Sequence, residues 1–329
     1  MATSTKTQNS NSVLRQLRRF ISTPGVGPFL ALIVAGLYFY LQNERFLTAF
    51  NISLILQQTS WIAALAIGQT LIILTAGIDL SNGLVMALGT VVMTTLAVNQ
   101  GLNPVLALTI GFIVTIGFGL LNGLIVTQLR IPPFIVTLGT LNIAFALTRI
   151  VSVTTISNLP PIQMFFGTRF ELFGTRFTYG SVAVLIMYVV MWFILRETDF
   201  GRHVYAVGDD PEAARLMGIS VNRVLIMVYA LSGFFYAMAG WILIGRIGSG
   251  DPNAGQTANL DSITAVVIGG TSLFGGRGSI MGSLIGALIV GVFINGLQIT
   301  GVDPLWQRFI TGVLVIMAVA IDQFSQRMR

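Results

Sequence analysis

The sequence predicts an all-α integral membrane protein of about ten transmembrane helices, with two inverted-topology repeats and both termini in the cytoplasm. Three observations support this fold class: the composition, a series of apolar segments and the distribution of basic residues. Of the 329 residues, 54% are hydrophobic and only 9% are charged, whereas soluble domains carry about 25% charged residues. Such a chain cannot cover itself with a water-soluble surface, so we expect hydrocarbon to be its main solvent.

Apolar segments follow one another along almost the whole chain, as expected for transmembrane helices of about 20 residues. They lie at 28–41, 52–75, 83–98, 104–126, 134–151, 179–195, 224–245, 262–274, 280–299 and 305–321. Segments 83–98 and 262–274 are short, which is typical of broken, re-entrant or tilted helices. The sequence leaves open whether these two segments fully cross the membrane.

Basic residues indicate the orientation, because cytoplasmic loops carry an excess of Lys and Arg. With the N-terminus inside and ten alternating spans, twelve of the 18 basic residues fall on the cytoplasmic side. These are Lys6, Arg15, Arg18, Arg19, Arg130, Arg196, Arg202, Arg215, Arg223, Arg277, Arg327 and Arg329, against Arg45, Arg149, Arg169, Arg176, Arg246 and Arg308 outside. We therefore expect a cytoplasmic tail over 1–24, without a cleaved signal peptide, and a single transmembrane domain over 25–329.

Composition also excludes several kinds of chemistry. The chain has no cysteine and a single histidine, His203, so thiolate and multi-histidine metal sites and disulfides are excluded. Lys6 is the only lysine, so a phosphate-binding loop of the G-x-x-x-x-G-K-S/T type cannot occur. The basic residues are scattered, unlike the clustered basic face that nucleic acid requires. We expect no catalytic residue, no metal and no cofactor on this chain, and no nucleic-acid partner.

An internal repeat relates segment 52–151 to segment 224–322. Asn122-Gly123-Leu124 precedes Pro132 and a Phe-Ile pair, and Asn295-Gly296-Leu297 precedes Pro304 and another Phe-Ile pair. The matching segments are five predicted spans apart, so the copies would face opposite ways across the membrane, as in inverted-repeat transporters. A chance alignment of glycine-rich apolar segments is the alternative.

One polar stretch, 196–223, carries the signals of a short cytoplasmic helix. Asp210 suits the N-cap, Pro211 the first helical position and Glu212 the positive end of the helix dipole, and Gly218 can end the helix in a left-handed conformation. An apolar face is expected from the spacing of three side chains, those of Ala213, Leu216 and Met217. From these signals alone, the helix either docks into a partner's groove or lies on its own bundle.

Polar side chains within apolar segments are costly in lipid and are expected to face neighbouring helices or a solute path. The candidates for the path are Gln57, Trp61, Gln69, Asp79, Asn82, Asn122, Asn142 and Asn295. Amides predominate, which favours an uncharged solute with several hydroxyl groups. Contact between helices is the ordinary alternative for each of these residues.

The segment EAARLMG, from Glu212 to Gly218, resembles the E-A-A-x-x-x-G signature of ATP-driven importer permeases. GIDLSNG from Gly77, NGLIVTQLRIPPFIVTLGT from Asn122, FGRHVYAVGDDPEAARLMGI from Phe200 and DSITAVVIGGTSLFGGRGSIMGSLIGALIVG from Asp261 are similar to ribose-type monosaccharide permeases. The resemblance implies that Asp210, Pro211, Glu212, Ala213, Ala214, Leu216, Met217 and Gly218 form a helix that couples the permease to a separate ATPase.

The same resemblance implies a particular assembly. Two permease copies would lie in the bacterial inner membrane beneath a periplasmic sugar-binding protein. ATP and Mg would bind to the cytoplasmic ATPase rather than to this chain, and ribose or fructose would be the solute. Importers of nucleosides or branched-chain amino acids share this plan and are the nearest alternative. An ion-coupled secondary carrier is a more distant one.

Overall fold

The computed structural model describes residues 26–172 and 174–327. The predicted cytoplasmic tail, 1–24, lies outside the described residues. Two 3₁₀ helices, η1 (Glu44–Leu47) and η2 (Phe165–Gly167), and a two-stranded hairpin, β1 (Arg169–Leu172) and β2 (Thr175–Thr178), accompany the α-helices. The α-helices are α2 (Val26–Gln42), α3 (Ala49–Leu74), α4 (Asn82–Val98), α5 (Pro104–Gln128), α6 (Pro133–Val151), α7 (Tyr179–Glu197), α8 (Asp199–Asp209), α9 (Pro211–Leu216), α10 (Val221–Ile247), α11 (Ala258–Ile268), α12 (Ile280–Ile299) and α13 (Pro304–Arg327).

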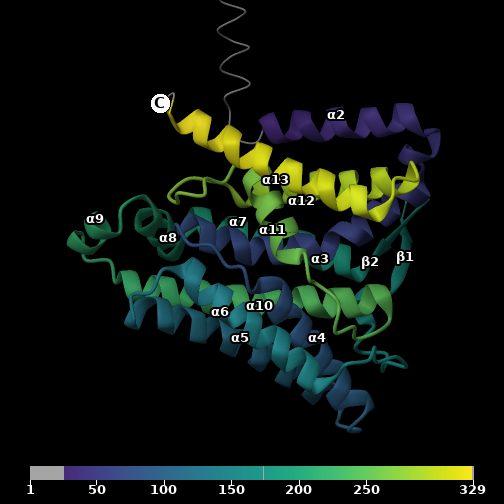
Figure 1. Cartoon of the computed structure of the whole chain (residues 1–329), viewed down its shortest axis with the longest axis horizontal. Coiled ribbons are helices and arrows are strands. Elements are labelled where there is room, and N and C mark those ends of the chain that lie inside the picture. Colours follow the sequence, from purple (N-terminus) through teal and green to yellow (C-terminus); the bar gives the residue numbers. More distant parts are fainter. Residues whose placement is uncertain (1–25, 173, 328–329) are drawn as a thin grey trace, which may run out of the picture.

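Helices α3 and α10 form the centre of the bundle. Helix α3 packs against α7, α10, α11 and α12, and α10 also packs against α4 and α5. Figure 1 shows α2, α12 and α13 on one side of this centre and α4, α5 and α6 on the other. The side chains from Ile62 to Leu74 are all buried, as expected of a helix that is apolar all round and lies inside the protein.

Each apolar segment of the sequence overlaps a helix of the structure. Six of the described helices are long and apolar enough to cross a membrane, namely α3, α5, α6, α7, α10 and α12. Length and composition thus agree with a multi-pass membrane protein. The total of ten spans, the inverted repeat and the topology stay predictions.

The eighth predicted segment, 262–274, ends earlier in the structure than expected. Helix α11 stops at Ile268, and Gly270 follows with a φ of +88°, a conformation that strongly favours glycine. The remaining residues of this segment belong to the loop before α12 rather than to a helix.

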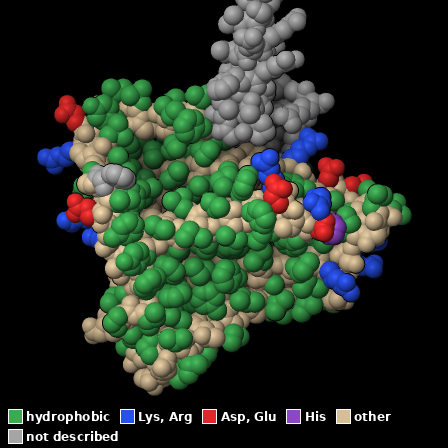
Figure 2. Space-filling model, turned by 180° about the vertical axis from the view of Figure 1, so that it is seen from behind, with side chains coloured by type: hydrophobic (Ala, Val, Ile, Leu, Met, Phe, Trp, Pro, Cys, Tyr) green, Lys and Arg blue, Asp and Glu red, His purple; other side chains and the backbone are tan. Residues whose placement is uncertain are grey.

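Surface chemistry divides the molecule into a broad apolar middle and two charged ends. In Figure 2, hydrophobic side chains cover the middle of the visible face, while charged side chains gather at its two ends. The described parts of helices α5, α6 and α7 contribute many exposed large apolar side chains. Because hydrocarbon is the solvent that accepts such a surface, the apolar middle is the part that a bilayer would cover.

The two polar elements outside the long helices lie at opposite ends of this bundle. Helices α8 and α9 project at one end and the β1–β2 hairpin lies at the other (Figure 1). The hairpin is antiparallel, with Phe170 opposite Phe177 and Glu171 opposite Arg176, and Gly174 in its turn has a φ of +72°. This hairpin was not predicted from the sequence.

Candidate functional sites

Helix α9 has the ends that the sequence predicts. The Asp210 carboxylate accepts hydrogen bonds from the backbone N–H groups of Glu212, at 2.9 Å, and Ala213, at 3.0 Å. Pro211 is the first helical residue, and Gly218 follows the helix with a φ of +85°. An N-cap of this kind stabilises a helix by about 0.5–2 kcal/mol, which matters for a helix of only six residues.

The apolar side chains of this segment point into solvent rather than onto the bundle. Leu216 is 89% exposed and Met217 is 83% exposed, while Ala214 is buried against the rest of the chain. The Arg215 guanidinium donates to the Glu212 carboxylate at 2.7 Å. Burial would favour two large apolar side chains at about 25 cal/mol per Å², so their exposure marks a surface suited to a partner.

Helix α8 connects this exposed segment to the body of the protein. The Tyr205 hydroxyl donates to the backbone oxygen of Gly278 at 3.0 Å, and burial raises the pKa of the Tyr205 phenol. Gly208 lies so close to the end of α3 that a Cβ would clash with the carbonyl oxygen of Leu74 and lie 2.7 Å from the Gly276 nitrogen. The Gly276 N–H in turn donates to that same oxygen at 3.0 Å. We call Gly208, Leu74 and Gly276 the glycine joint.

A second group of polar side chains is buried in the middle of the bundle. We call it the Asp79 cluster; it comprises Gln69, Asp79, Ser81, Asn82, Asn122, Tyr236 and Ser262, which are all buried. Its members come from α3, α4, α5, α10 and α11 and from the loop before α4. Segments of both predicted repeats therefore meet in this cluster.

Hydrogen bonds surround the Asp79 carboxylate on both oxygens. Oδ1 accepts from the backbone N–H of Ser81 at 2.7 Å and from the Ser81 hydroxyl at 2.6 Å, and Oδ2 accepts from the Tyr236 hydroxyl at 2.9 Å. The Asn122 amide donates to the Ser81 hydroxyl at 3.2 Å. Paired in this way, a buried carboxylate is far less costly than an isolated one.

The amides of the cluster are only partly satisfied. Asn82 Nδ2 donates to Gln69 Oε1 and to the Ser262 hydroxyl, both at 2.8 Å. Gln69 Nε2, Asn82 Oδ1 and Asn122 Oδ1 are buried and have no hydrogen-bond partner among the described residues. A buried polar atom without a hydrogen bond costs about 1–3 kcal/mol. These three amide atoms can therefore still donate to or accept from a further polar group.

The predicted path residues thus fall into two sets. Gln69, Asp79, Asn82 and Asn122 meet in the Asp79 cluster, whereas the others lie apart from it. Asn295 accepts from the Asn51 amide at 2.8 Å. Asn142 is exposed and donates to the Leu138 oxygen of its own helix. Trp61 is partly buried against the core. A role in the path stays a prediction for the residues of both sets.

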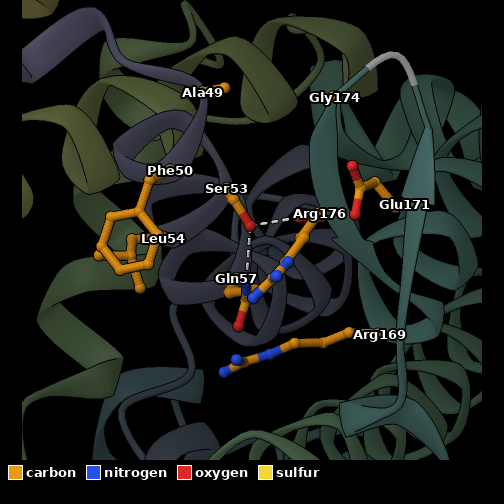
Figure 3. A pocket seen from close by; sticks show the side chains of 9 residues that line it. All are labelled: Ala49, Phe50, Ser53, Leu54, Gln57, Arg169, Glu171, Gly174 and Arg176. Carbon is orange, nitrogen blue, oxygen red and sulfur yellow. Dashed lines mark hydrogen bonds between the residues drawn. The ribbon is translucent and has the colours of Figure 1, made fainter.

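Gln57, the remaining predicted residue, lies in a pocket at the hairpin end of the molecule. This pocket, the hairpin pocket, has a volume of about 370 Å³ and is lined by Ala49, Phe50, Ser53, Leu54, Gln57, Arg169, Glu171, Gly174 and Arg176. Figure 3 shows the two arginine side chains extending across the pocket beside Gln57, with Glu171 on the hairpin. The Ser53 hydroxyl donates to the backbone oxygen of Arg176, and Gln57 Nε2 donates to that hydroxyl at 2.8 Å.

Several residues of these sites were not predicted from the sequence. Ser81, Tyr236 and Ser262 complete the Asp79 cluster, and Arg169, Glu171 and Arg176 line the hairpin pocket. The alternation of polar and aromatic residues on either side of Gly174 is the one signal that could have indicated a hairpin.

Apolar spans, buried polar side chains and an exposed short helix are the features of a multi-pass membrane protein, and the comparisons identify its class as a permease. Residues 51–319 match the family model described as the permease component of the branched-chain amino acid transport system. The chain belongs to this permease family.

Relatives in this family match almost the whole chain. The chain is 46% identical to the fructose import permease protein of Rhizobium meliloti, over 97% of this chain and 91% of that protein. It is 39% identical to the ribose import permease protein of Bacillus subtilis, over 91% and 92%. It is 38% identical to the galactose/methyl galactoside import permease protein of Escherichia coli, over 91% and 94%. No solved structure matches the chain.

Proposed function

We propose that this chain is the membrane permease subunit of an ATP-binding-cassette importer that moves a monosaccharide into the cytoplasm by alternating access. The observation that carries the proposal is the pair of exposed apolar side chains, Leu216 and Met217, at the end of helix α9, on a chain that has no nucleotide-binding loop of its own. A separate ATPase, which would bind ATP and Mg, supplies the force through α9. The remaining partners are a periplasmic sugar-binding protein and a second permease copy, in the bacterial inner membrane.

A sugar is the solute that the relatives support. The three relatives named above are import permeases for fructose, ribose and galactose, so a nucleoside or branched-chain amino acid is not favoured, although the family description names the latter. Ribose and fructose are the solutes we propose. The uncharged amides of the Asp79 cluster are consistent with such a solute, and we assign this cluster to the gate of the path.

A coupled mechanism follows from the glycine joint. A displacement of α9 reaches α8 directly, because only Asp210 separates the two helices. Through the glycine joint and the Tyr205 hydrogen bond, α8 contacts the last turn of α3 and the loop before α12. Asp79 follows α3 by five residues, so the same displacement would alter the hydrogen bonds of the Asp79 cluster. Stiff contacts of this kind are a physical route for coupling between distant sites.

Two substitutions in the α9 segment test the proposal. Glu212→Arg reverses a charge at the positive end of the helix dipole, and Gly218→Val places a β-branched residue at a positive φ. Both are expected to abolish sugar uptake and binding of the ATPase subunit, while membrane insertion is unchanged. Gly101→Val is the matched control. Like Gly218, Gly101 has a positive φ, of +65°, and no atom within 4 Å of its Cβ, but it lies in the loop between α4 and α5, outside the α9 segment. Normal uptake by both variants would remove the coupling role.

A further inference from the structure

The hairpin pocket combines hydrogen-bond donors, hydrogen-bond acceptors and an apolar wall. Arg169 and Arg176 offer fixed forks of N–H donors, and Glu171 and the Gln57 amide oxygen offer acceptors. Phe50, whose side chain is 70% exposed, and Leu54 form the apolar side (Figure 3). Ligand sites of this volume, about 300–1,000 Å³, typically pair apolar walls with a few converging polar groups.

The charged groups of this pocket are not paired with one another. Glu171 and Arg176 lie directly opposite in the hairpin, yet none of the ion pairs among the described residues includes Arg169, Glu171 or Arg176. Holding three unpaired charges around one pocket gains nothing for the fold. Their hydrogen-bonding capacity is therefore available to a ligand.

The chemistry of the pocket lining favours a polyol over an anion as the ligand. An anionic group needs donors only, and the Glu171 carboxylate would repel it. A sugar hydroxyl both donates and accepts, so it can use the guanidinium groups and the carboxylate together. Ser53 and Gln57 at the floor are buried, so a small molecule reaches them more readily than a flat protein surface does.

We infer that the hairpin pocket is a reception site for a monosaccharide. By this we mean that the pocket binds the sugar before the sugar enters the path between the helices. This inference rests on the proposed function. In the predicted topology the loop between α6 and α7 is periplasmic, so the pocket would face the binding protein that delivers the sugar. Arg169, Glu171, Arg176 and Gln57 hold the hydroxyl groups, and Phe50 covers a C–H face of the ring.

The test is uptake by the importer reconstituted in liposomes with its ATPase, while the concentration of sugar-loaded binding protein is varied. The probes are labelled fructose and labelled ribose. Arg176→Gln and Glu171→Gln change exposed side chains, so they should leave the bundle intact, and Arg176→Lys tests whether the fork geometry matters. Arg45→Gln, an exposed arginine of η1 outside the pocket lining, is the matched control.

For the two glutamine variants we expect the maximal uptake rate to fall by about tenfold, the effect of losing a charged hydrogen bond. The concentration of binding protein at half the maximal rate should stay unchanged, and Arg45→Gln should behave as wild type. A raised half-maximal concentration at an unchanged maximal rate would make the pocket a protein-docking surface and overturn the inference. Unchanged kinetics in both variants would overturn it as well. If the wild-type importer itself takes up neither sugar, it is the proposed function that fails.

Discussion

At the residue scale, buried hydrogen bonds hold the side chains of the Asp79 cluster in place. Asp79 is bonded on both carboxylate oxygens by groups from its own loop and from α10. Polarity within apolar segments was enough to select Gln69, Asp79 and Asn122 from the sequence. It could not separate them from Asn142, which lies on an exposed face of α6, because polarity alone does not say which way a helix turns each side chain. Hydroxyl groups such as Tyr236 gave no signal at all.

Tyr236→Phe is the residue-scale prediction. It removes the hydroxyl that donates to Asp79 Oδ2 and leaves this buried oxygen without that bond, at a cost of about 1–3 kcal/mol. We expect a lower midpoint of thermal unfolding in detergent and slower uptake. The control is Tyr38→Phe, whose side chain on α2 is exposed. Equal midpoints for wild type and Tyr236→Phe would show that this bond does not stabilise the Asp79 cluster.

At the element scale, local signals and long-range contacts were predictable to different degrees. The short helix α9 follows from Asp210, Pro211 and Gly218, which act within a few residues of one another, so the sequence placed it correctly. The pairing of β1 with β2 is also local, and the alternation of polar and aromatic residues beside Gly174 was its unused signal. The attachment of the hairpin to α3 through Ser53 joins segments far apart in the chain, and such a contact leaves little local trace in a sequence.

The glycine joint gives the element-scale prediction. In Gly208→Ala the new methyl group meets the Leu74 carbonyl oxygen and the Gly276 nitrogen, so α8 must shift away from α3. We expect sugar uptake to fall at least about tenfold, in line with a misplaced coupling element, while the ATPase subunit still binds. Binding and uptake are measured on the same preparation.

Gly36→Ala is the matched control for this variant, because nothing lies within 4 Å of its Cβ. Loss of ATPase binding together with uptake would mean that Gly208 shapes the docking surface itself. Unchanged uptake would mean that α8 does not transmit the motion.

At the scale of the whole molecule, composition alone predicted that hydrocarbon is the main solvent of this protein. Only 9% of the residues are charged, and on the face that Figure 2 shows the charged side chains lie at the two ends, with apolar side chains between them. Apolar runs located the helices well, because length and hydropathy suffice for that. The apolar segment 262–274 extends beyond the end of α11, because the pair Gly269 and Gly270 stops the helix after Ile268.

The absence of cysteine from the sequence gives a direct test of topology. Met217→Cys in the α9 segment and Glu171→Cys in the hairpin each provide a single exposed thiol. With a membrane-impermeant maleimide on intact spheroplasts, we expect labelling of Glu171→Cys alone, and labelling of Met217→Cys only after the membrane is opened. Labelling of both from outside would contradict the predicted orientation.

The proposed function depends most on the division between a chain that shapes the path and a partner that supplies the force. The most direct measurement is sugar accumulation in liposomes that contain the purified permease, either alone or with the ATPase and sugar-loaded binding protein, with ATP inside the vesicles in both cases. We expect accumulation against a gradient only in the complete assembly. Accumulation by the permease alone would show that no partner is needed to supply the force, and the proposed function would be wrong.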